Sequence, residues 1–453
     1  MASNHETSVQ HDVDSEEDMI HYKGRMGMME MGLEDVDKYN KGGFHPIHLD
    51  DVLDDRFHVA QKLGHGGFGT VWLCRDLKLN KWRAVKVIAA KRSTGSSEEK
   101  VFDYLRKNCT LEELEENHIM VPLEEFWIDG PNGRHRCLVM PVLGWPVSDW
   151  RIEHQNHKEE TNEITRNVCR EIIKALNFLH GHGICHGDFR PGNILMKIEG
   201  FDDLDNKQLE ELMGGEELWN VETVSGQPLS PRAPKYLVES ARYGWSKTLS
   251  TGSIAVVDFG ESFFDKDPPR TTGIPDLWAA PEVLFEGSRP IGLPSDVWSL
   301  ACTLCEVRTE ISLFSSWLGG FNQRINRIEH YLGPLPWYYW KAYRKMLADM
   351  RRKRSHGDQR EQEGSQHELG EDTEKTESES GQSDEETEYP NMFFEDLLSE
   401  QSAHDHETNQ SFKYRFPEKE MVELGDLLYQ MLKYEPGERI KTSSIISHPW
   451  VGY

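Results

Sequence analysis

The sequence predicts an α+β protein of two lobes, a β-rich N-terminal lobe followed by a mainly helical C-terminal lobe. From Phe57 to Val87, apolar and polar residues alternate around a cluster of glycines, which is typical of strands in a small sheet. From Ile164 to His180, apolar residues recur every three or four positions, as on a helix with one buried face. We therefore expect the first lobe over residues 42–143 and the second over residues 144–453.

Three stretches fall outside this two-lobe pattern. Residues 1–41 are polar and acidic without sustained periodicity, so we expect a disordered tail there. An insertion is expected at about 200–252, where more than 50 residues connect two strand signals that a short turn could join. A second insertion is expected at about 353–390, because residues 358–388 hold thirteen acidic and two basic residues and few apolar ones.

The composition indicates which kinds of molecule the protein binds and in which cellular compartment it resides. The net charge of −27 over 453 residues disfavours direct nucleic-acid binding and favours basic protein partners. No apolar run is long enough to cross a membrane. Seven scattered cysteines and a polar N-terminus indicate a reducing compartment, cytoplasmic or nuclear or both, and we expect a monomer. The basic run at 351–354 fits a nuclear localisation signal or the positive end of a solvated helix.

The close pair Cys302 and Cys305 has the spacing of zinc ligands. It lies in the apolar run DVWSLACTLCEV, and no second pair follows it. A buried core helix is therefore the favoured interpretation.

Four polar residues predict phosphoryl transfer. The segment HGDFRPGN at 186–193 is followed by VDFG, so that Asp258 comes 65 residues after Asn193. Asp188 is the candidate base that orients an acceptor hydroxyl, and Arg190 would supply positive charge to the γ-phosphate. Asn193 and Asp258 carry the oxygen atoms that Mg²⁺ prefers, and nucleotide phosphates would complete its shell.

A glycine-rich segment predicts a nucleotide-binding flap. Gly64, Gly66 and Gly69 fit the pattern GxGxxGxV between two strand signals. The same glycines also suit a dinucleotide-binding fold or a purely structural hairpin. Lys86 favours the flap, because a lysine within an apolar strand is explained by pairing with the α- and β-phosphates of ATP.

Lys86 requires a carboxylate partner on the following helix, expected from about Ser97 to Lys107. Glu98 and Glu99 are both candidates. Glu98 is preferred because apolar residues follow it at helical spacing on the face that would pack inward. The complete set of residues expected to bind ATP is Leu63, Gly64, His65, Gly66, Gly67, Phe68, Gly69, Val71, Ala84, Lys86, Met140, Pro141, Leu143 and Leu195. Adenine would lie at Met140–Leu143, bonded to backbone groups of Pro141 and Leu143.

These motifs resemble those of the eukaryotic protein kinase family over residues 57–453, apart from the two insertions. The glutamate of AAPEV comes 24 residues after the aspartate of DFG, and DVWSL and PGERIKTSSIISHPWV come later. The resemblance implies a bilobal protein-kinase fold. It also implies that Glu282 pairs with Arg439 and that Asp296 braces the catalytic loop from beneath.

A narrower likeness lies upstream, where the segment GGFHPIHLDDVLDDRFHVAQKLGHGGFGTVWLCRD at 42–76 resembles the SR-protein kinases. An insert between the catalytic loop and DFG is also similar to that subfamily. The likeness implies a Ser/Thr protein kinase that uses ATP and Mg²⁺ and acts on basic, Arg/Ser-rich proteins such as splicing factors.

Two positions depart from the family pattern. Gly187 stands where an arginine usually precedes the catalytic aspartate, so we expect activity that does not depend on phosphorylation of the activation segment. Ile274 stands where Ser/Thr kinases place a threonine, which leaves open a pseudokinase that scaffolds basic proteins. A small-molecule phosphotransferase of the aminoglycoside kinase type is a further alternative, against which AAPEV, DVWSL and HPW argue.

Overall fold

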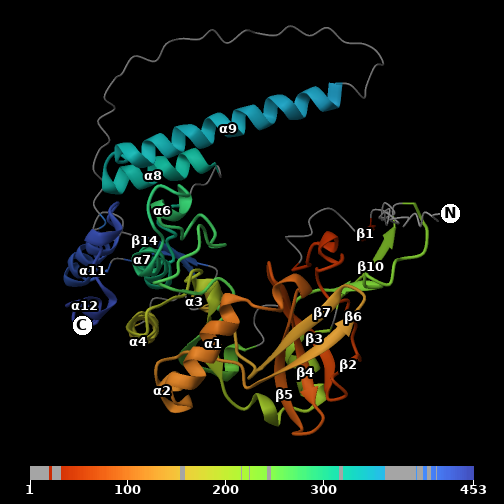
Figure 1. Ribbon diagram of the computed structural model, residues 1–453. Helices are drawn as coiled ribbons and strands as arrows, with labels where there is room; N and C mark the ends of the chain where they lie inside the picture. The colour runs from red at the N-terminus through yellow and green to blue at the C-terminus, as the bar shows by residue number, and fades with distance from the viewer. Residues whose placement is uncertain are drawn as a thin grey trace, which may run out of the picture. The chain divides into compact units, whose positions relative to one another are not determined.

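The computed structural model divides the chain into two compact units. It describes residues 20–22, 32–153, 159–215, 217–223, 225–241, 246–315, 320–362, 394, 401–405, 410–414 and 416–452. The first unit draws on Met1–Ser96, Pro122–Leu143 and Ile198–Leu249 (Figure 1). The second unit draws on Ser97–Val121, Gly144–Lys197 and Ser250–Tyr453. The expected insertion after residue 200 therefore groups with the first unit, whereas we expected it to interrupt the second lobe.

A six-stranded antiparallel sheet forms the centre of the first unit. Its strands lie in the order β2-β3-β4-β5-β7-β6. They span Val52–Leu53 (β2), Phe57–His65 (β3), Gly69–Asp76 (β4), Lys81–Ile88 (β5), Glu124–Gly130 (β6) and Gly133–Met140 (β7). Side chains that alternate along these strands, among them Val59, Trp72 and Val139, bury one face of the sheet. The prediction of a β-rich first lobe is confirmed.

A second, three-stranded sheet joins the N-terminal region to the insertion. Its strands are β1 (Ile20–Tyr22), β10 (Leu218–Thr223) and β11 (Tyr236–Val238), paired in that order. Beside it, Leu33, Val36 and Tyr39 are buried in one cluster with Val221 and Leu237. Residues 32–41 are therefore folded, and their assignment to a disordered tail was wrong. The three apolar side chains lie close enough in sequence to bury a cluster around the 3₁₀ helix η2 (Val36–Lys38).

Short helices complete the first unit. They are η3 (Ala90–Arg92), η5 (Phe201–Asp203), α5 (Asn206–Met213) and η6 (Lys247–Leu249). Leu209 and Met213 of α5 pack in a cluster with Leu73 and Trp82 of the central sheet. Asp202 also accepts a hydrogen bond from the backbone of Trp82 at 2.7 Å. The insertion is thus an integral part of the first unit's core.

The second unit is mainly helical, as predicted. Its helices are α1 (Ser97–Asn108), α2 (Leu111–Glu116), α3 (Val147–Glu153), α4 (Glu159–Gly181), α6 (Pro281–Leu284), α7 (Leu293–Thr309), α8 (Phe321–Leu332), α9 (Trp337–Gln362), α11 (Glu418–Met431) and α12 (Thr442–Ile445), with the 3₁₀ helix η7 (Pro436–Glu438). Nearly every side chain of α7 is buried, including the free thiols of Cys302 and Cys305. The prediction of a core helix there is confirmed.

Short strands flank the loops of the second unit. They are β8 (Ile184–Cys185), β9 (Ile194–Ile198), β12 (Ser250–Val256), β13 (Phe263–Phe264), β14 (Gln401–Asp405) and β15 (Gln410–Tyr414). β9 pairs with β12, and β8 pairs antiparallel with β13. The polar residues of HGDFRPGN therefore lie between β8 and β9, and Asp258 follows β12.

The first ten residues of the second expected insertion are helical. α9 continues to Gln362, so residues 353–362 are helical. The basic and polar residues of this stretch include no proline, which would end a helix. Most of the acidic stretch that follows lies outside the described residues. Within the described part of the chain, no helix has both the length and the apolar character needed to cross a membrane.

Candidate active site

The loop between β8 and β9 is held from below by one buried carboxylate. Asp296 on α7 accepts hydrogen bonds from the backbone amides of His186, at 2.7 Å, and Gly187, at 3.0 Å. His180 on α4 lies 3.2 Å from the same carboxylate. These contacts confirm the brace that the family resemblance implied for Asp296. They fix the backbone immediately before Asp188.

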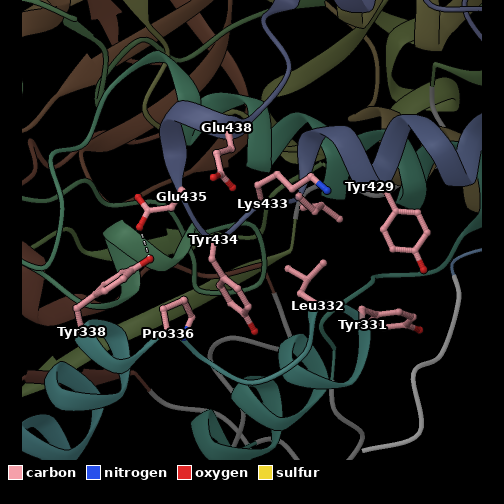
Figure 2. A pocket seen from close by; sticks show the side chains of 10 residues that line it. Tyr331, Leu332, Pro336, Tyr338, Tyr429, Lys433, Tyr434, Glu435 and Glu438 are labelled. Carbon is pink, nitrogen blue, oxygen red and sulfur yellow. Dashed lines mark hydrogen bonds between the residues drawn. The ribbon is translucent and has the colours of Figure 1, made fainter.

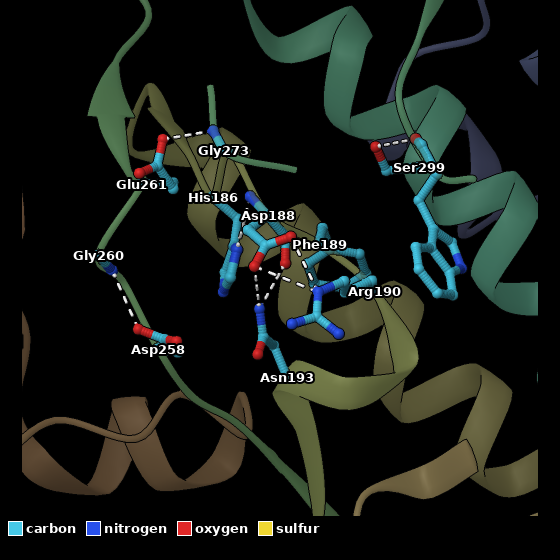
Figure 3. Close-up of polar contacts among 12 residues, drawn as sticks. His186, Asp188, Phe189, Arg190, Asn193, Asp258, Gly260, Glu261, Gly273 and Ser299 are labelled. Carbon is cyan, nitrogen blue, oxygen red and sulfur yellow. Dashed lines mark hydrogen bonds and ion pairs between the residues drawn. The ribbon is translucent and has the colours of Figure 1, made fainter. Parts of the chain in front are cut away.

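Asp188 is the centre of a polar cluster within this loop (Figure 3). Its carboxylate accepts hydrogen bonds from the amide of Asn193, at 2.7 Å, and from Nε of Arg190, at 3.0 Å. The side chain is only 13% exposed. Burial raises the pKa of Asp188, while Arg190, His186 and Asn193 oppose that rise and Asp258 adds to it. A raised pKa makes this carboxylate a better proton acceptor than an exposed aspartate.

Asn193 and Asp258 are brought together by a backbone contact. The amide of Val257 donates to the carbonyl of Asn193 at 3.0 Å. The side-chain amide nitrogen of Asn193 is turned toward Asp188, and its oxygen points away from it (Figure 3). Asp258 adopts a left-handed backbone with φ of 59°, which is uncommon outside glycine and typical of functional sites.

An amide oxygen and a carboxylate suit a hard cation better than zinc. No group of three or more His, Cys, Asp and Glu side chains is placed to hold a metal ion anywhere in the described residues. The pair Asn193 and Asp258 therefore fits Mg²⁺ that takes its remaining ligands from a nucleotide and water. The two residues remain the predicted metal ligands.

The glycine-rich segment forms the turn between β3 and β4 in the first unit. The amide of Gly66 donates to the carbonyl of Gly69 at 2.9 Å, which closes the turn. A side chain on Gly69 would lie 2.3 Å from the carbonyl oxygen of Val87, so only glycine fits there. Side chains on Gly64 or Gly66 would meet nothing within 4 Å, which leaves open space beside the flap.

The other predicted nucleotide-binding residues fall into both units. Lys86 lies on β5, opposite Val71 on β4 and Leu138 on β7. Ala84 lies opposite Met140 at the end of β7, where the segment with Pro141 and Leu143 begins. Leu195 lies on β9 in the second unit. Their joint binding of ATP stays a prediction.

Glu98 lies on the inward face of α1, together with Val101, Phe102 and Leu105. This confirms the helix and the face that favoured Glu98, whose side chain is 4% exposed, over the partly buried Glu99. Lys86 belongs to the first unit and Glu98 to the second. The ion pair between them stays a prediction.

Trp278 and Glu306 are site residues that sequence reasoning missed. Nε1 of Trp278 donates to Glu306 at 3.2 Å, and the guanidinium of Arg190 lies 5.8 Å from the centre of the Trp278 ring. Burial raises the pKa of Glu306 to about 7. The signal that could have found Glu306 is a charged residue within the mostly apolar run that follows Trp298 on α7.

The pairing of Glu282 with Arg439, implied by the family resemblance, is confirmed. The guanidinium contacts both oxygens of the carboxylate, at 2.6 and 2.8 Å, and both side chains are fully buried. Ser295 donates a further hydrogen bond to Glu282 at 2.8 Å. This bidentate pair ties the AAPEV segment to the C-terminal part of the second unit.

A cavity of about 470 Å³ lies elsewhere in the second unit (Figure 2). Its lining is rich in tyrosine and comprises Tyr331, Leu332, Pro336, Tyr338, Tyr429, Leu432, Lys433, Tyr434, Glu435 and Glu438. Tyr338 and Arg289 both donate to Glu435, at 2.5 and 3.0 Å. None of the predicted site residues lines this cavity, so it is distinct from the polar cluster around Asp188.

Comparison with known proteins supports one interpretation of this site. The protein kinase domain family matches residues 57–206 and 248–451. Human SRSF protein kinase 3 is 33% identical over 182 residues, which cover 39% of this chain and 31% of that protein. The serine/threonine-protein kinase SRPK of Physarum polycephalum is 24% identical over 427 residues, which cover 92% of this chain and 91% of that protein. The matched region thus spans about a third of SRSF protein kinase 3.

The fold is also similar to that of a solved structure. A crystal structure of a kinase domain matches with a TM-score of 0.51 and 20% identity, covering 89% of this chain and 98% of the other. At this level of identity the match supports a kinase-like arrangement of elements and nothing about substrate.

Proposed function

Since this chain belongs to the protein kinase family, we propose that it transfers the γ-phosphoryl group of ATP to serine or threonine hydroxyls of proteins. The observation that carries the proposal is the polar cluster around Asp188. The carboxylate is held by Asn193 and Arg190, and the backbone before it is held by Asp296. An acceptor hydroxyl aimed by a fixed carboxylate is what phosphoryl transfer requires of a protein.

Each residue of the site takes one role in this proposal. Asp188 orients the acceptor hydroxyl and receives its proton, and Arg190 offers positive charge to the phosphoryl group. Asn193 and Asp258 would hold Mg²⁺, which neutralises charge on the phosphates when bound. Lys86, positioned by Glu98, would pair with the α- and β-phosphates beneath the glycine flap at Gly64–Gly69.

Two close contacts fix the position of the Arg190 guanidinium. A side chain on Gly192 would lie 2.4 Å from Nη1 of Arg190, so the glycine leaves room for the guanidinium. Its Nε already pairs with Asp188. The guanidinium is thereby fixed next to the predicted base with part of its surface still exposed.

Basic, Arg/Ser-containing proteins are the proposed substrates. The net charge of −27 favours encounter with cationic polypeptides. The likeness to SRSF protein kinase 3 and to the Physarum SRPK agrees with a kinase of this type.

The test compares acceptors and variants in parallel. Purified protein is incubated with ATP, Mg²⁺ and one of three acceptors: an Arg/Ser peptide, an acidic Ser peptide or an aminoglycoside. We expect the Arg/Ser peptide to be phosphorylated most efficiently. Asp188→Ala should lower kcat by about 10³-fold, because the substrate hydroxyl then has no carboxylate to take its proton.

Asp203→Ala is the matched control, since Asp203 is exposed in the insertion. Transfer to the aminoglycoside alone would support the small-molecule phosphotransferase instead. ATP binding without turnover by the wild type would support the pseudokinase scaffold.

A further inference from the structure

The activation segment, residues 259–280, begins under a tight steric constraint. Gly187, directly before Asp188, has φ of +76°, and a side chain there would lie 2.2 Å from the carbonyl oxygen of Glu261. The backbone of Glu261 therefore passes against the catalytic loop (residues 186–193) at Gly187, where there is no side chain in the way. With the backbone in this position, a side chain such as arginine has no room at residue 187.

The side chain of Glu261 reaches forward along the segment. Its Oε2 accepts a hydrogen bond from the backbone amide of Gly273 at 2.6 Å (Figure 3). A side chain on Gly273 would lie 3.1 Å from the same carboxylate, so the two groups are tightly packed. One carboxylate thus closes a loop between Glu261 and Gly273, which lie twelve positions apart.

Both ends of this loop are fixed to the body of the second unit. Next to Glu261, β13 pairs with β8, where Phe263 lies opposite Cys185. After Gly273, Ile274 is 8% exposed, and the carbonyl of Trp278 accepts a hydrogen bond from Ser299 at 2.9 Å. The bond between Glu261 and Gly273 links these two anchored ends.

We propose that Glu261 is a positioning residue that holds the activation segment in place without phosphorylation. A carboxylate that accepts from a backbone amide makes a charge-assisted hydrogen bond, which is stronger than a neutral one. A carboxylate, unlike a phosphorylated hydroxyl, needs no modification to make such a bond, and Gly187 stands in place of the arginine that a loop phosphate would contact. The inference rests on the proposed kinase function, because it assigns the segment a part in presenting the protein acceptor.

The role predicts a specific kinetic effect. Gly273 leads directly into the segment that ends at AAPEV, whereas the catalytic loop is held separately by Asp296. Loss of the bond should loosen the protein-acceptor side of the site and leave the groups that hold ATP in place. We therefore expect a higher KM for the peptide acceptor, with ATP hydrolysis in the absence of acceptor nearly unchanged.

The test uses Glu261→Ala, Glu261→Gln and the matched control Glu286→Ala, whose glutamate is exposed in the same unit. Glu261→Ala should raise the KM for an Arg/Ser peptide about tenfold, as expected for loss of a hydrogen bond to a charged group. Glu261→Gln keeps an acceptor oxygen and should stay within about threefold of the wild type. Glu286→Ala should behave as the wild type does.

Hydrogen exchange followed by mass spectrometry gives a readout that does not need activity. Glu261→Ala should speed amide exchange in a peptide covering 268–278 about tenfold, and Glu286→Ala should not change it. Unchanged exchange and unchanged KM in Glu261→Ala would overturn the proposal. Equal damage in Glu261→Ala and Glu261→Gln, or equal loss of ATP hydrolysis and peptide phosphorylation, would also overturn it. A wild type that phosphorylates no peptide contradicts the proposed function, and the exchange data then decide the role of Glu261 separately.

Discussion

Glu306 shows how one side chain next to the catalytic loop depends on its surroundings. It lies on α7 beneath Trp278, whose indole donates to its carboxylate. Burial raises its pKa from 4.5 to about 7, while Trp278 and the charge of Arg190 partly offset the effect. The folded chain therefore binds a proton at Glu306 over a range in which the unfolded chain has lost it.

This shift predicts a dependence of stability on pH. Between pH 4.5 and about 7 the folded state binds more protons at Glu306, so its contribution to stability falls as pH rises through that window. Glu306→Gln keeps an acceptor for Trp278 and removes the titration. Relative to the wild type, its Tm should rise by on the order of 2 °C more at pH 8 than at pH 5. Thermal unfolding at both pH values, with the exposed Glu286→Gln as control, checks this expectation; an equal Tm difference at both pH values would contradict it.

The catalytic residues could be predicted from the sequence because they lie close together in it. Asp188, Arg190 and Asn193 lie within six positions, so their mutual contacts follow from one loop. Glu306 and Trp278 contact each other across 28 positions, and no pattern in either segment records that contact. The same holds for Glu261 and Gly273, which only the folded activation segment brings together.

At the scale of elements, a buried ion pair attaches the N-terminal segment to the central sheet. Lys62 on β3 contacts Glu34 and donates to the carbonyl of Val238 on β11 at 3.0 Å. Both charged side chains are almost fully buried, and Tyr39 donates to Glu34 at 2.6 Å. Lys62 lies two residues before the glycine flap, so this pair joins three stretches of chain near it.

Removal of one partner should therefore destabilise the first unit strongly. Glu34→Ala leaves Lys62 buried without its carboxylate, which is expected to cost about 3–5 kcal/mol of unfolding free energy. The double variant Glu34→Leu with Lys62→Met should recover most of that loss, because it buries no charge. Glu211→Ala, which breaks the exposed pair with Lys207, should change stability by less than about 0.5 kcal/mol. Urea unfolding of the three variants measures these differences, and a loss of under 1 kcal/mol in Glu34→Ala would contradict the expectation.

The activation segment gives a second prediction at this scale. Thr271 and Thr272 precede Gly273 and are the residues that a regulating kinase would phosphorylate there. Because Gly187 provides no arginine to receive a phosphate, the double variant Thr271→Ala with Thr272→Ala should retain at least about half of the wild-type kcat/KM. A collapse of activity in the purified double variant, restored by Thr271→Glu or Thr272→Glu, would refute phosphorylation-independent activity.

At the scale of the whole molecule, the excess of negative charge would favour encounter with the proposed basic substrates. The net charge of −27 is spread well beyond the acidic stretch at 358–388, which accounts for −11 of it. Charges act over about 10 Å at 0.1 M salt and about 3 Å at 1 M. Attraction for a cationic polypeptide is therefore strong at low salt and largely screened at high salt.

Salt should then separate binding from chemistry. Raising ionic strength from about 0.05 to 0.5 M should raise the KM for an Arg/Ser peptide several-fold and leave kcat nearly unchanged. A neutral Ser peptide serves as control, since its KM should hardly respond. Initial rates at several salt concentrations measure both constants. A salt-independent KM for the basic peptide would argue against electrostatic selection.

The division of the chain was the least predictable feature at this scale. The strand pattern around Phe57–Val87 and the helical pattern from Ile164 both identified their elements. The placement of the insertion with the first unit depends on Val221, Leu237 and Val238, which pack against residues nearly two hundred positions earlier. Neither composition nor periodicity reports such distant packing.

The interleaved first unit has a consequence for synthesis on the ribosome. Its core includes Val238, so the nascent chain cannot complete the folding of this unit until that residue has been translated and has left the ribosome. At about 5–20 residues per second, roughly 7–28 s pass between translation of Ser96 and of Val238. During that interval the exposed apolar face of the central sheet is a natural target for chaperones, and slower translation of residues 198–249 should increase aggregation of the newly made protein.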